Sequence, residues 1–341
     1  MRLSDFDFEL PEGAIARRPA DRRDRSRLLR LDRHSGAREH RHFFELPELL
    51  QPGDLLVVND SKVLKARLYT HKEGSGGKVE VLLIEPVSPT DDRRWRAMVA
   101  ASKPVRVGAR LVLPGAEPLV VEAVEGEGFV VVHLPEPALG LTERLGALPL
   151  PPYMERPAEA ADAERYQTVY AAAGKEGSVA APTAGLHFTP ELLAALTERG
   201  IERANITLHV GPGTFLPVRT DDVSHHQMHA ERFVIPEETA QAISRAKSEG
   251  RRVVAVGTTV VRTLESQSLV LPGLGSTALF IKPGFEFRTV DALITNFHLP
   301  RSTLLMLVSA FAGTERVLAA YREAVASGYR FYSYGDAMLI A

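Results

Sequence analysis

The fold is decided by residues 178–218, SVAAPTAGLHFTPELLAALTERGIERANITLHVGPGTFLPV. Thr189 is a good N-cap, Pro190 suits the first helical turn, and Gly200 can end a helix in the left-handed conformation. These three residues predict a helix between them. From Ile201 onward apolar and polar residues alternate, which predicts a strand with one apolar face and one polar face. A helix that leads directly into a strand indicates an α/β fold.

Polar loops adjoin both of these elements. The turn ahead of the helix carries Thr183 and His187, and the strand ends near His209. The loop after the strand contains Gly211, Pro212, Gly213 and Thr214. Ligands of open α/β sheets bind at the carboxyl ends of strands, and glycine lets backbone N–H groups approach a ligand closely. The segment therefore predicts part of a binding site.

Two further strand ends repeat this pattern. The apolar runs at residues 253–256 and 291–295 are each followed by polar residues. Those residues are Gly257, Thr258 and Thr259 after the first run, and Asn296 and His298 after the second. The carboxyl ends of parallel strands meet at one edge of a sheet, so we expect these loops to converge with the loop after His209. The convergence points to an active site more strongly than any single loop does.

Composition narrows the class of protein. With 341 residues, the chain is long enough for two domains. The net charge of −2 gives no general attraction to a polyanion, so contact with a nucleic acid needs a local basic patch. The chain contains no cysteine, which excludes disulfides, thiolate nucleophiles and cysteine-ligated metals. We find no signal peptide, and the apolar run at residues 304–312 is too short to span a bilayer, so we expect a cytoplasmic protein.

The chain divides into two kinds of sequence. Residues 67–148 hold short apolar or alternating runs between glycine- and proline-rich turns, with no helical period to interrupt them. This pattern predicts a small all-β barrel or sandwich. Residues 1–66 and 149–341 alternate strands with helices, which predicts an α/β domain whose mixed sheet is covered by helices. We therefore expect the β domain to be an insertion in the α/β catalytic domain.

Several side-chain clusters allow two interpretations each. His225, His226, His229 and Glu231 have metal-ligand spacings, but a polar contact to substrate by His229 and Glu231 is favoured. Arg17, Arg18, Arg22 and Arg23 form either a phosphate-binding strip or, with the acidic residues between them, a salt-bridged turn. His187 and His298 suit either a structural role or general acid–base catalysis. Residues 329–336, YRFYSYGD, form either an edge strand or an aromatic and carboxylate wall for a cation.

Familiar signatures of other enzyme classes are missing. The sequence has no G-x-x-x-x-G-K phosphate loop, no G-x-G-x-x-G fingerprint and no G-x-S-x-G elbow. Simple ATPase, dehydrogenase and esterase functions lose support. Two alternatives from other classes are a metal hydrolase at residues 225–231 and a non-catalytic RNA-binding module built around the β domain, although the His, Thr and Asn residues at the strand ends argue against the binding module.

Long motifs, in order along nearly the whole chain, identify a family resemblance. They are LPPY at 150–153, ERYQTVY at 164–170, APTAGLHF at 181–188, HVGPGTF at 209–215, VGTTVVRTLE at 256–265, TNFHLP at 295–300 and YSYGDAML at 332–339. In these motifs the chain resembles the S-adenosylmethionine:tRNA ribosyltransferase-isomerase family of queuosine biosynthesis. So many motifs in one order make chance agreement improbable. The strongest rival is an S-adenosylmethionine-dependent methyltransferase, but the usual glycine-rich strand-helix fingerprint is absent.

The resemblance implies a reaction and its partners. The ribosyl part of S-adenosylmethionine is transferred to the aminomethyl nitrogen of a 7-aminomethyl-7-deazaguanine at the tRNA wobble position. The products are epoxyqueuosine-tRNA, adenine and methionine. S-adenosylmethionine is then a co-substrate, and we expect no permanently bound cofactor, no metal, no membrane contact and a monomer.

The implied reaction assigns roles to the candidate residues. Proton transfer and charge stabilisation are expected from His187, His209 and Asp336, with the identity of the base left open. Substrate binding is expected from Thr183, Gly211, Gly213, Thr214, His229, Glu231, Thr258, Thr259, Arg262, Asn296, His298, Tyr332 and Tyr334. RNA binding is expected from Arg17, Arg18, Arg22 and Arg23, and the substrate cleft is expected between the two domains.

Overall fold

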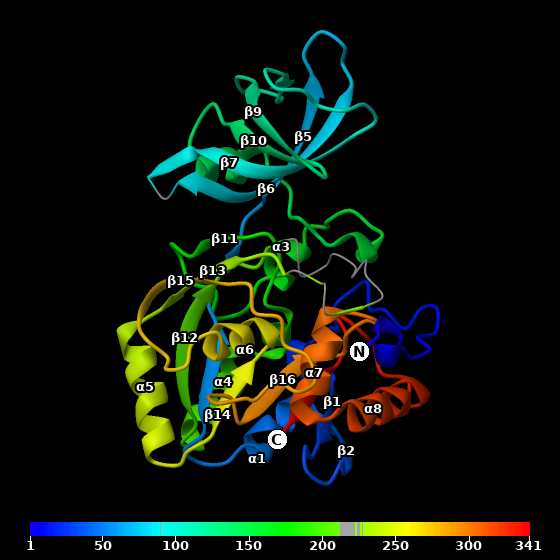
Figure 1. Ribbon diagram of the computed structural model, residues 1–341, viewed down its shortest axis with the longest axis vertical. Helices are drawn as coiled ribbons and strands as arrows, with labels where there is room; N and C mark the ends of the chain where they lie inside the picture. Colours follow the sequence, from blue (N-terminus) through cyan, green and yellow to red (C-terminus); the bar gives the residue numbers. More distant parts are fainter. Residues whose placement is uncertain (89, 212–221, 224–225, 227) are drawn as a thin grey trace.

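The computed structural model describes residues 1–88, 90–211, 222–223, 226 and 228–341. Figure 1 shows a large body built on one sheet and, above it, a separate barrel. The body holds both ends of the chain, while the barrel is made from the middle of the sequence. The predicted class, a helix-covered mixed sheet with a small barrel, is therefore confirmed.

The large sheet has nine strands. In spatial order they are β15 (Gly273–Thr277), β13 (Glu231–Ile235), β12 (Glu202–Leu208), β3 (Leu55–Asn59), β14 (Val253–Val256), β16 (Ala292–Asn296), β17 (Ala337–Ile340), β1 (Arg27–Leu31) and β2 (Arg38–His42). The four neighbours β12, β3, β14 and β16 are parallel, and β13, β15, β17 and β2 each pair antiparallel with a neighbour. The carboxyl ends of the four parallel strands consequently share one edge.

The central strands are buried on both faces. Leu55 and Val57 of β3 pack into one apolar cluster, while Leu56 and Val58 pack into another. Parallel sheets need this double cover, and continuous Val, Ile and Leu runs provide for it. The covering helices are α1 (Leu46–Leu49), α4 (Pro190–Glu198), α5 (Glu237–Ser248), α6 (Thr258–Glu265), α7 (Thr303–Ala312) and α8 (Thr314–Ala326). Helices α1 and α4 cover one face, and α5 to α8 cover the other.

The helix predicted between Thr189 and Gly200 is confirmed as α4. The Thr189 hydroxyl accepts a hydrogen bond of 3.1 Å from the backbone N–H of Leu192, as an N-cap should. Gly200 takes a φ of 77° after the helix, a conformation that glycine adopts without strain. Strand β12 then alternates as expected except at Thr207, which is buried because its hydroxyl bonds the Asp60 carboxylate at 2.6 Å.

Six strands close the barrel. They are β5 (Arg67–Lys72), β6 (Lys78–Ser88), β7 (Asp91–Ala101), β8 (Arg110–Val112), β9 (Leu119–Gly126) and β10 (Phe129–His133). Among the described residues no helix interrupts the six strands, as expected, and a short helix, α2 (Ala138–Leu145), follows β10. It has eight residues, too few for a helical period to stand out, and its Leu141 is buried in the barrel core. The domain limits at residues 66/67 and 148/149 stay a prediction.

Short elements complete the chain. They are β4 (Lys62–Val63), β11 (Glu176–Ser178), α3 (Asp162–Arg165), and the 3-10 turns η1 (Leu3–Phe6), η2 (Arg23–Arg25), η3 (Phe43–Glu45), η4 (Pro152–Met154) and η5 (Thr183–His187). Within the residues described, no single helix is long and apolar enough to cross a membrane. Helices α7 and α8 together pass that test by length and composition only, and they meet at 115°.

Candidate active site

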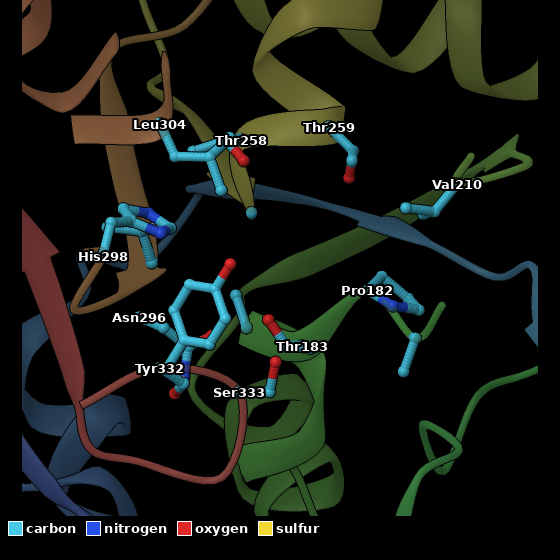
Figure 2. A pocket seen from close by; sticks show the side chains of 14 residues that line it. Pro182, Thr183, Val210, Thr258, Thr259, Asn296, His298, Leu304, Tyr332 and Ser333 are labelled. Atoms are coloured by element: carbon cyan, nitrogen blue, oxygen red, sulfur yellow. The ribbon is translucent and has the colours of Figure 1, made fainter. Parts of the chain in front are cut away.

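A cavity lies where the parallel strands end. Figure 2 shows its walls, which come from the residues after β12, β14 and β16, from η5, and from a turn at residues 332–333. The described lining residues are Ala181, Pro182, Thr183, Ala184, Val210, Gly257, Thr258, Thr259, Thr295, Asn296, His298, Leu304, Tyr332 and Ser333. The cavity encloses about 490 Å³ of space outside protein atoms, its open mouth included. The expected convergence of the three strand ends is thus observed.

Many of the predicted substrate-binding residues meet here. Thr183, Thr258, Thr259, Asn296, His298 and Tyr332 all line the cavity. Sequence reasoning missed the hydroxyl of Ser333, although the residue lies inside a motif already singled out. It also missed the apolar contributions of Val210 and Leu304, because apolar residues carry no chemical signal of their own.

The described lining of the cavity combines apolar surface with uncharged polar groups. Among the described residues that line it, none is Asp, Glu, Lys or Arg. Burial lowers the pKa of His298 to about 3, so its ring is neutral at pH 7. The Nε2 atom of that ring lies 2.8 Å from the Thr295 hydroxyl, and the His298 backbone N–H donates to the Tyr321 hydroxyl at 3.1 Å. The walls therefore offer hydroxyl, amide and imidazole groups without a net charge.

Tyr332 reaches the cavity through an unusual backbone conformation. Its φ is 74°, in the left-handed region that few residues other than glycine adopt. Its N–H donates to the Phe297 carbonyl at 2.9 Å, and its ring packs edge-on against Tyr153 with centroids 4.1 Å apart. Burial raises the pKa of Tyr332, so the phenol keeps its proton. Residues 329–336 thus form a turn beside the cavity rather than an edge strand, and the final strand, β17, begins only at Ala337.

His187 lies behind the cavity instead of lining it. Its Nδ1 lies 2.6 Å from the Ser26 hydroxyl, and its Nε2 lies 3.0 Å from Nδ2 of Asn296. Its ring stacks on Phe43 with centroids 4.9 Å apart. Burial, and then the charges of Arg330 and Arg23, lower the pKa of His187 to about 3. Both ring nitrogens have partners within the protein, which favours a positioning role over proton transfer.

Asp336 and Tyr334 also lie outside the cavity wall. The Asp336 carboxylate accepts the backbone N–H groups of Arg27 at 2.9 Å and of Arg330 at 2.8 Å. It thereby holds β1 against the turn that carries Tyr332. The Tyr334 hydroxyl donates to the Asp162 carboxylate at 2.8 Å. These contacts hold the turn that forms part of the cavity wall. Neither Asp336 nor Tyr334 is among the described residues that line the cavity.

Comparisons with known proteins agree over the whole chain. The family model described as "Queuosine biosynthesis protein" matches residues 3–340. A protein of Anaeromyxobacter dehalogenans (strain 2CP-C) named S-adenosylmethionine:tRNA ribosyltransferase-isomerase is 60% identical, and the match covers 100% of this chain and 99% of the relative. A protein of the same name from Moorella thermoacetica is 53% identical, with 100% of both covered. The chain belongs to the S-adenosylmethionine:tRNA ribosyltransferase-isomerase family.

A solved member of the family has the same architecture. The crystal structure of the S-adenosylmethionine tRNA ribosyltransferase from Thermotoga maritima is 39% identical to this chain. The match has a TM-score of 0.57 and covers 99% of this chain and 100% of the other. The resemblance first drawn from sequence motifs is therefore confirmed at the level of the family.

In this member of the family, other predicted residues border a second pocket, between the barrel and the sheet. Its described lining comprises Ile84, Glu85, Arg96, Phe129, His209, Gly211, His229, Ala230, Glu231 and Arg232. Burial, followed by the charges of Arg232 and Lys175, lowers the pKa of His209 to about 4. Residues 209 and 211 line this pocket while Val210 lines the first, so one segment forms the wall between them. This second pocket lies between the barrel and the sheet, and the expectation that substrate binds between the two domains stays a prediction.

Glu231 and Arg262 bind each other. Oε2 of Glu231 lies 2.5 Å from Nη1 of Arg262, and Oε1 accepts the backbone N–H of Gly211 at 3.0 Å. Arg262 also donates to the carbonyl oxygen of Leu279 at 3.0 Å. The Arg262 guanidinium is thereby engaged with the protein, and the pair fixes the start of the loop after β12.

Some predictions fall on residues outside the description. Gly213, Thr214 and His225 belong to that part of the chain. Within the described ranges, no group of three or more His, Cys, Asp or Glu side chains is arranged to hold a metal ion. His229 instead lies against the Phe129 ring, with centroids 6.0 Å apart.

The basic strip at the N-terminus contains the ion pairs of the salt-bridged interpretation, while phosphate binding by it stays a prediction. Arg17 pairs with Glu155, and Arg18 forms two hydrogen bonds with Glu159, yet both arginines are exposed. Arg22 pairs with Asp24 at 2.9 Å. Arg23 differs, because its guanidinium donates to the carbonyl oxygens of Glu164, Arg165 and Leu186. Its role in the fold is structural, whereas the other three present charge to solvent.

Proposed function

We propose that the protein transfers and isomerises the ribosyl moiety of S-adenosylmethionine onto 7-aminomethyl-7-deazaguanine at the tRNA wobble position. The products are epoxyqueuosine-tRNA, adenine and methionine. The observation that carries the proposal is the family membership along residues 3–340, together with a cavity whose walls are built from the shared motifs. S-adenosylmethionine acts as a co-substrate, and its positively charged sulfonium acidifies the neighbouring ribose carbon.

The reaction needs little from the protein beyond placement and proton transfer. A base removes a proton from the ribose carbon next to the sulfonium, the glycosidic C–N bond breaks, and adenine leaves with a proton. The aminomethyl nitrogen loses a proton as it bonds to the ribosyl group, and the C–S bond breaks so that methionine leaves with the electron pair that neutralises its sulfur. His209 borders the second pocket and is our candidate for proton transfer. His187 and Asp336 act from behind the first cavity by holding its walls.

The RNA approaches from the barrel side in this proposal. An anticodon loop is single-stranded, so its target base can be turned out and placed in a pocket. At the second pocket, an ion pair of 3.3 Å between Arg232 and Glu85 joins the sheet to the barrel. The exposed Arg17, Arg18 and Arg22 then bind the flanking phosphates.

A product assay tests the function directly. The purified protein is incubated with S-adenosylmethionine and an anticodon stem-loop that carries the 7-aminomethyl-7-deazaguanine base. We expect adenine and methionine in equal amounts, with a matching mass gain on the RNA. A stem-loop with guanine at the wobble position is the matched control and should release neither product.

Each other outcome names a rival. Release of S-adenosylhomocysteine would identify a methyltransferase. Tight RNA binding without any reaction would identify a non-catalytic RNA-binding module.

A further inference from the structure

The carboxamide of Asn296, the last residue of β16, is held by backbone carbonyl groups. Its Nδ2 atom lies 3.2 Å from the carbonyl oxygen of Tyr332 and 3.5 Å from that of Asp336. A carbonyl oxygen only accepts hydrogen bonds, so the atom that faces both must be the amide nitrogen. The orientation of the Asn296 side chain is thus fixed by its backbone neighbours.

His187 reinforces this orientation through its tautomer. Since Asn296 donates from Nδ2, Nε2 of His187 must be the acceptor and Nδ1 must carry the proton. The Nδ1–H group donates a hydrogen bond to the Ser26 hydroxyl oxygen, and the Ser26 hydroxyl donates to the Arg23 carbonyl oxygen at 3.2 Å. The hydrogen bonds from Asn296 through His187 and Ser26 to the Arg23 carbonyl therefore assign each proton to one atom. A neutral His187 is required, which agrees with its lowered pKa.

The same series determines what the cavity presents to a ligand. Because Nδ2 of Asn296 points back toward His187 and the carbonyls, we infer that Oδ1, the other polar atom of the carboxamide, faces the cavity that Asn296 lines. The side chain itself is 2% exposed. A buried acceptor with a fixed direction recognises an N–H donor and rejects a carbonyl at the same place.

The described lining of the first cavity contains no charged side chain, so we expect an uncharged part of the substrate to bind there. The sulfonium, the methionine carboxylate, the phosphates and the protonated aminomethyl group are all charged, and burying a charge without a partner is costly. Adenine is the neutral portion of S-adenosylmethionine. Tyr332 places an aromatic ring in the cavity, and a purine ring can pack against its face.

Resting on the proposed function, we propose that Oδ1 of Asn296 accepts a hydrogen bond from the 6-amino group of the adenine, and that His187 is the positioning residue that holds Oδ1 in place. The pair makes the cavity selective for a 6-amino purine over a 6-oxo purine. In the 6-oxo compound a carbonyl oxygen would face Oδ1, with no hydrogen bond and a repulsion between two acceptors.

Binding of adenosine and inosine by calorimetry tests the proposal without RNA. Wild type should bind adenosine at least about tenfold more tightly than inosine. Asn296→Leu, of similar size, should bring the ratio of the two dissociation constants close to one. His187→Phe should lower the ratio because the carboxamide is then free to turn. His187→Gln places an amide oxygen where Nε2 was and should retain the ratio.

Matched variants separate recognition from folding. Ser309→Ala removes a buried hydroxyl of α7 that has no hydrogen-bond partner among the described residues, and it should leave the ratio unchanged. If His187→Phe fails to fold, Ser26→Ala tests the same series from its other end. Unfolding curves for all variants show which of them are native.

Three results would overturn the proposal: a wild-type ratio near one, an unchanged ratio in Asn296→Leu, or identical behaviour of His187→Phe and His187→Gln. The product assay is independent of this measurement. Turnover with a ratio near one would leave the proposed function standing and remove this inference. If wild type prefers adenosine, Asn296→Leu removes that preference and the product assay shows no turnover, this inference would stand and the proposed function would be removed.

Discussion

Glu231 and Arg262 form an ion pair with both side chains almost fully buried, 5% and 3% exposed. The pair joins β13 to α6, and through the Gly211 N–H it also fixes the exit from β12. Three segments that approach the cavity are thus held by one carboxylate. The arrangement makes the pair a determinant of site geometry as well as of stability.

Loss of one partner of this pair should destabilise the protein strongly. Arg262→Met breaks the buried ion pair by removing the guanidinium that binds Glu231, and we expect a loss of about 3–5 kcal/mol in the free energy of unfolding. Denaturant unfolding measures this difference. Arg245→Met is the matched control, because Arg245 is half exposed and pairs with Glu202 at 3.5 Å on the surface. Its cost should stay below about 1 kcal/mol, and equal losses in the two variants would contradict the argument.

Asp162 should make stability depend on pH. Burial alone raises its pKa, but hydrogen bonds from Arg156, from the Glu159 N–H and from Tyr334 outweigh burial and hold the pKa below its ordinary value. The folded protein therefore binds this proton less readily than the unfolded chain does. The contribution is present above the unfolded-state pKa of about 3.9 and is lost as the pH falls through the lower folded-state pKa.

The change to test this contribution is Asp162→Asn. From neutral pH down to about pH 3, the free energy of unfolding should fall less in Asp162→Asn than in wild type. Asp92→Asn, at an exposed carboxyl on the barrel, should follow the wild-type curve. Parallel curves for wild type and Asp162→Asn would show that the carboxylate is not stabilised by the fold.

Gly335→Ala should displace the turn that carries Tyr332 and Ser333. A Cβ at this glycine would lie 2.5 Å from the carbonyl oxygen of Arg330, so the backbone would have to move. We expect lower turnover and a stability loss of about 1–3 kcal/mol, measured on the same samples. Gly140→Ala in α2 meets nothing closer than 3.9 Å and should leave turnover intact. Full activity of Gly335→Ala would mean that the turn tolerates the shift.

Charge reversal in the basic strip should weaken RNA binding. Arg18→Glu replaces an exposed guanidinium, and we expect weaker binding of the anticodon stem-loop and a salt dependence reduced by about one phosphate contact. Arg245→Glu, on the surface of α5, is the control and should change neither. Arg23→Ala should instead lower the unfolding midpoint, because three backbone carbonyls lose their donor. Unchanged affinity and salt slope in Arg18→Glu would remove the strip from the RNA surface.

The sequence by itself determined the local elements and the family. Thr189 and Gly200 mark the ends of α4 because caps act within a few residues of chain. The apolar runs that became β3, β14 and β16 are visible because a strand buried on both faces needs a continuous apolar sequence. Polar residues directly after such runs located the cavity, since parallel strands end at one edge. The barrel was predictable from its turns, but the short helix α2 was not.

Only the tertiary structure decided which of the candidate residues face the ligand. His187 and Asn296 both lie in polar motifs, yet Asn296 lines the cavity and His187 lies behind it. Glu231 and Arg262 look like two separate substrate contacts in the sequence and are partners in the fold. The physical reason is that a backbone pattern is encoded over a few neighbouring residues. The direction of a side chain and the partner it meets depend instead on packing between segments far apart in the chain.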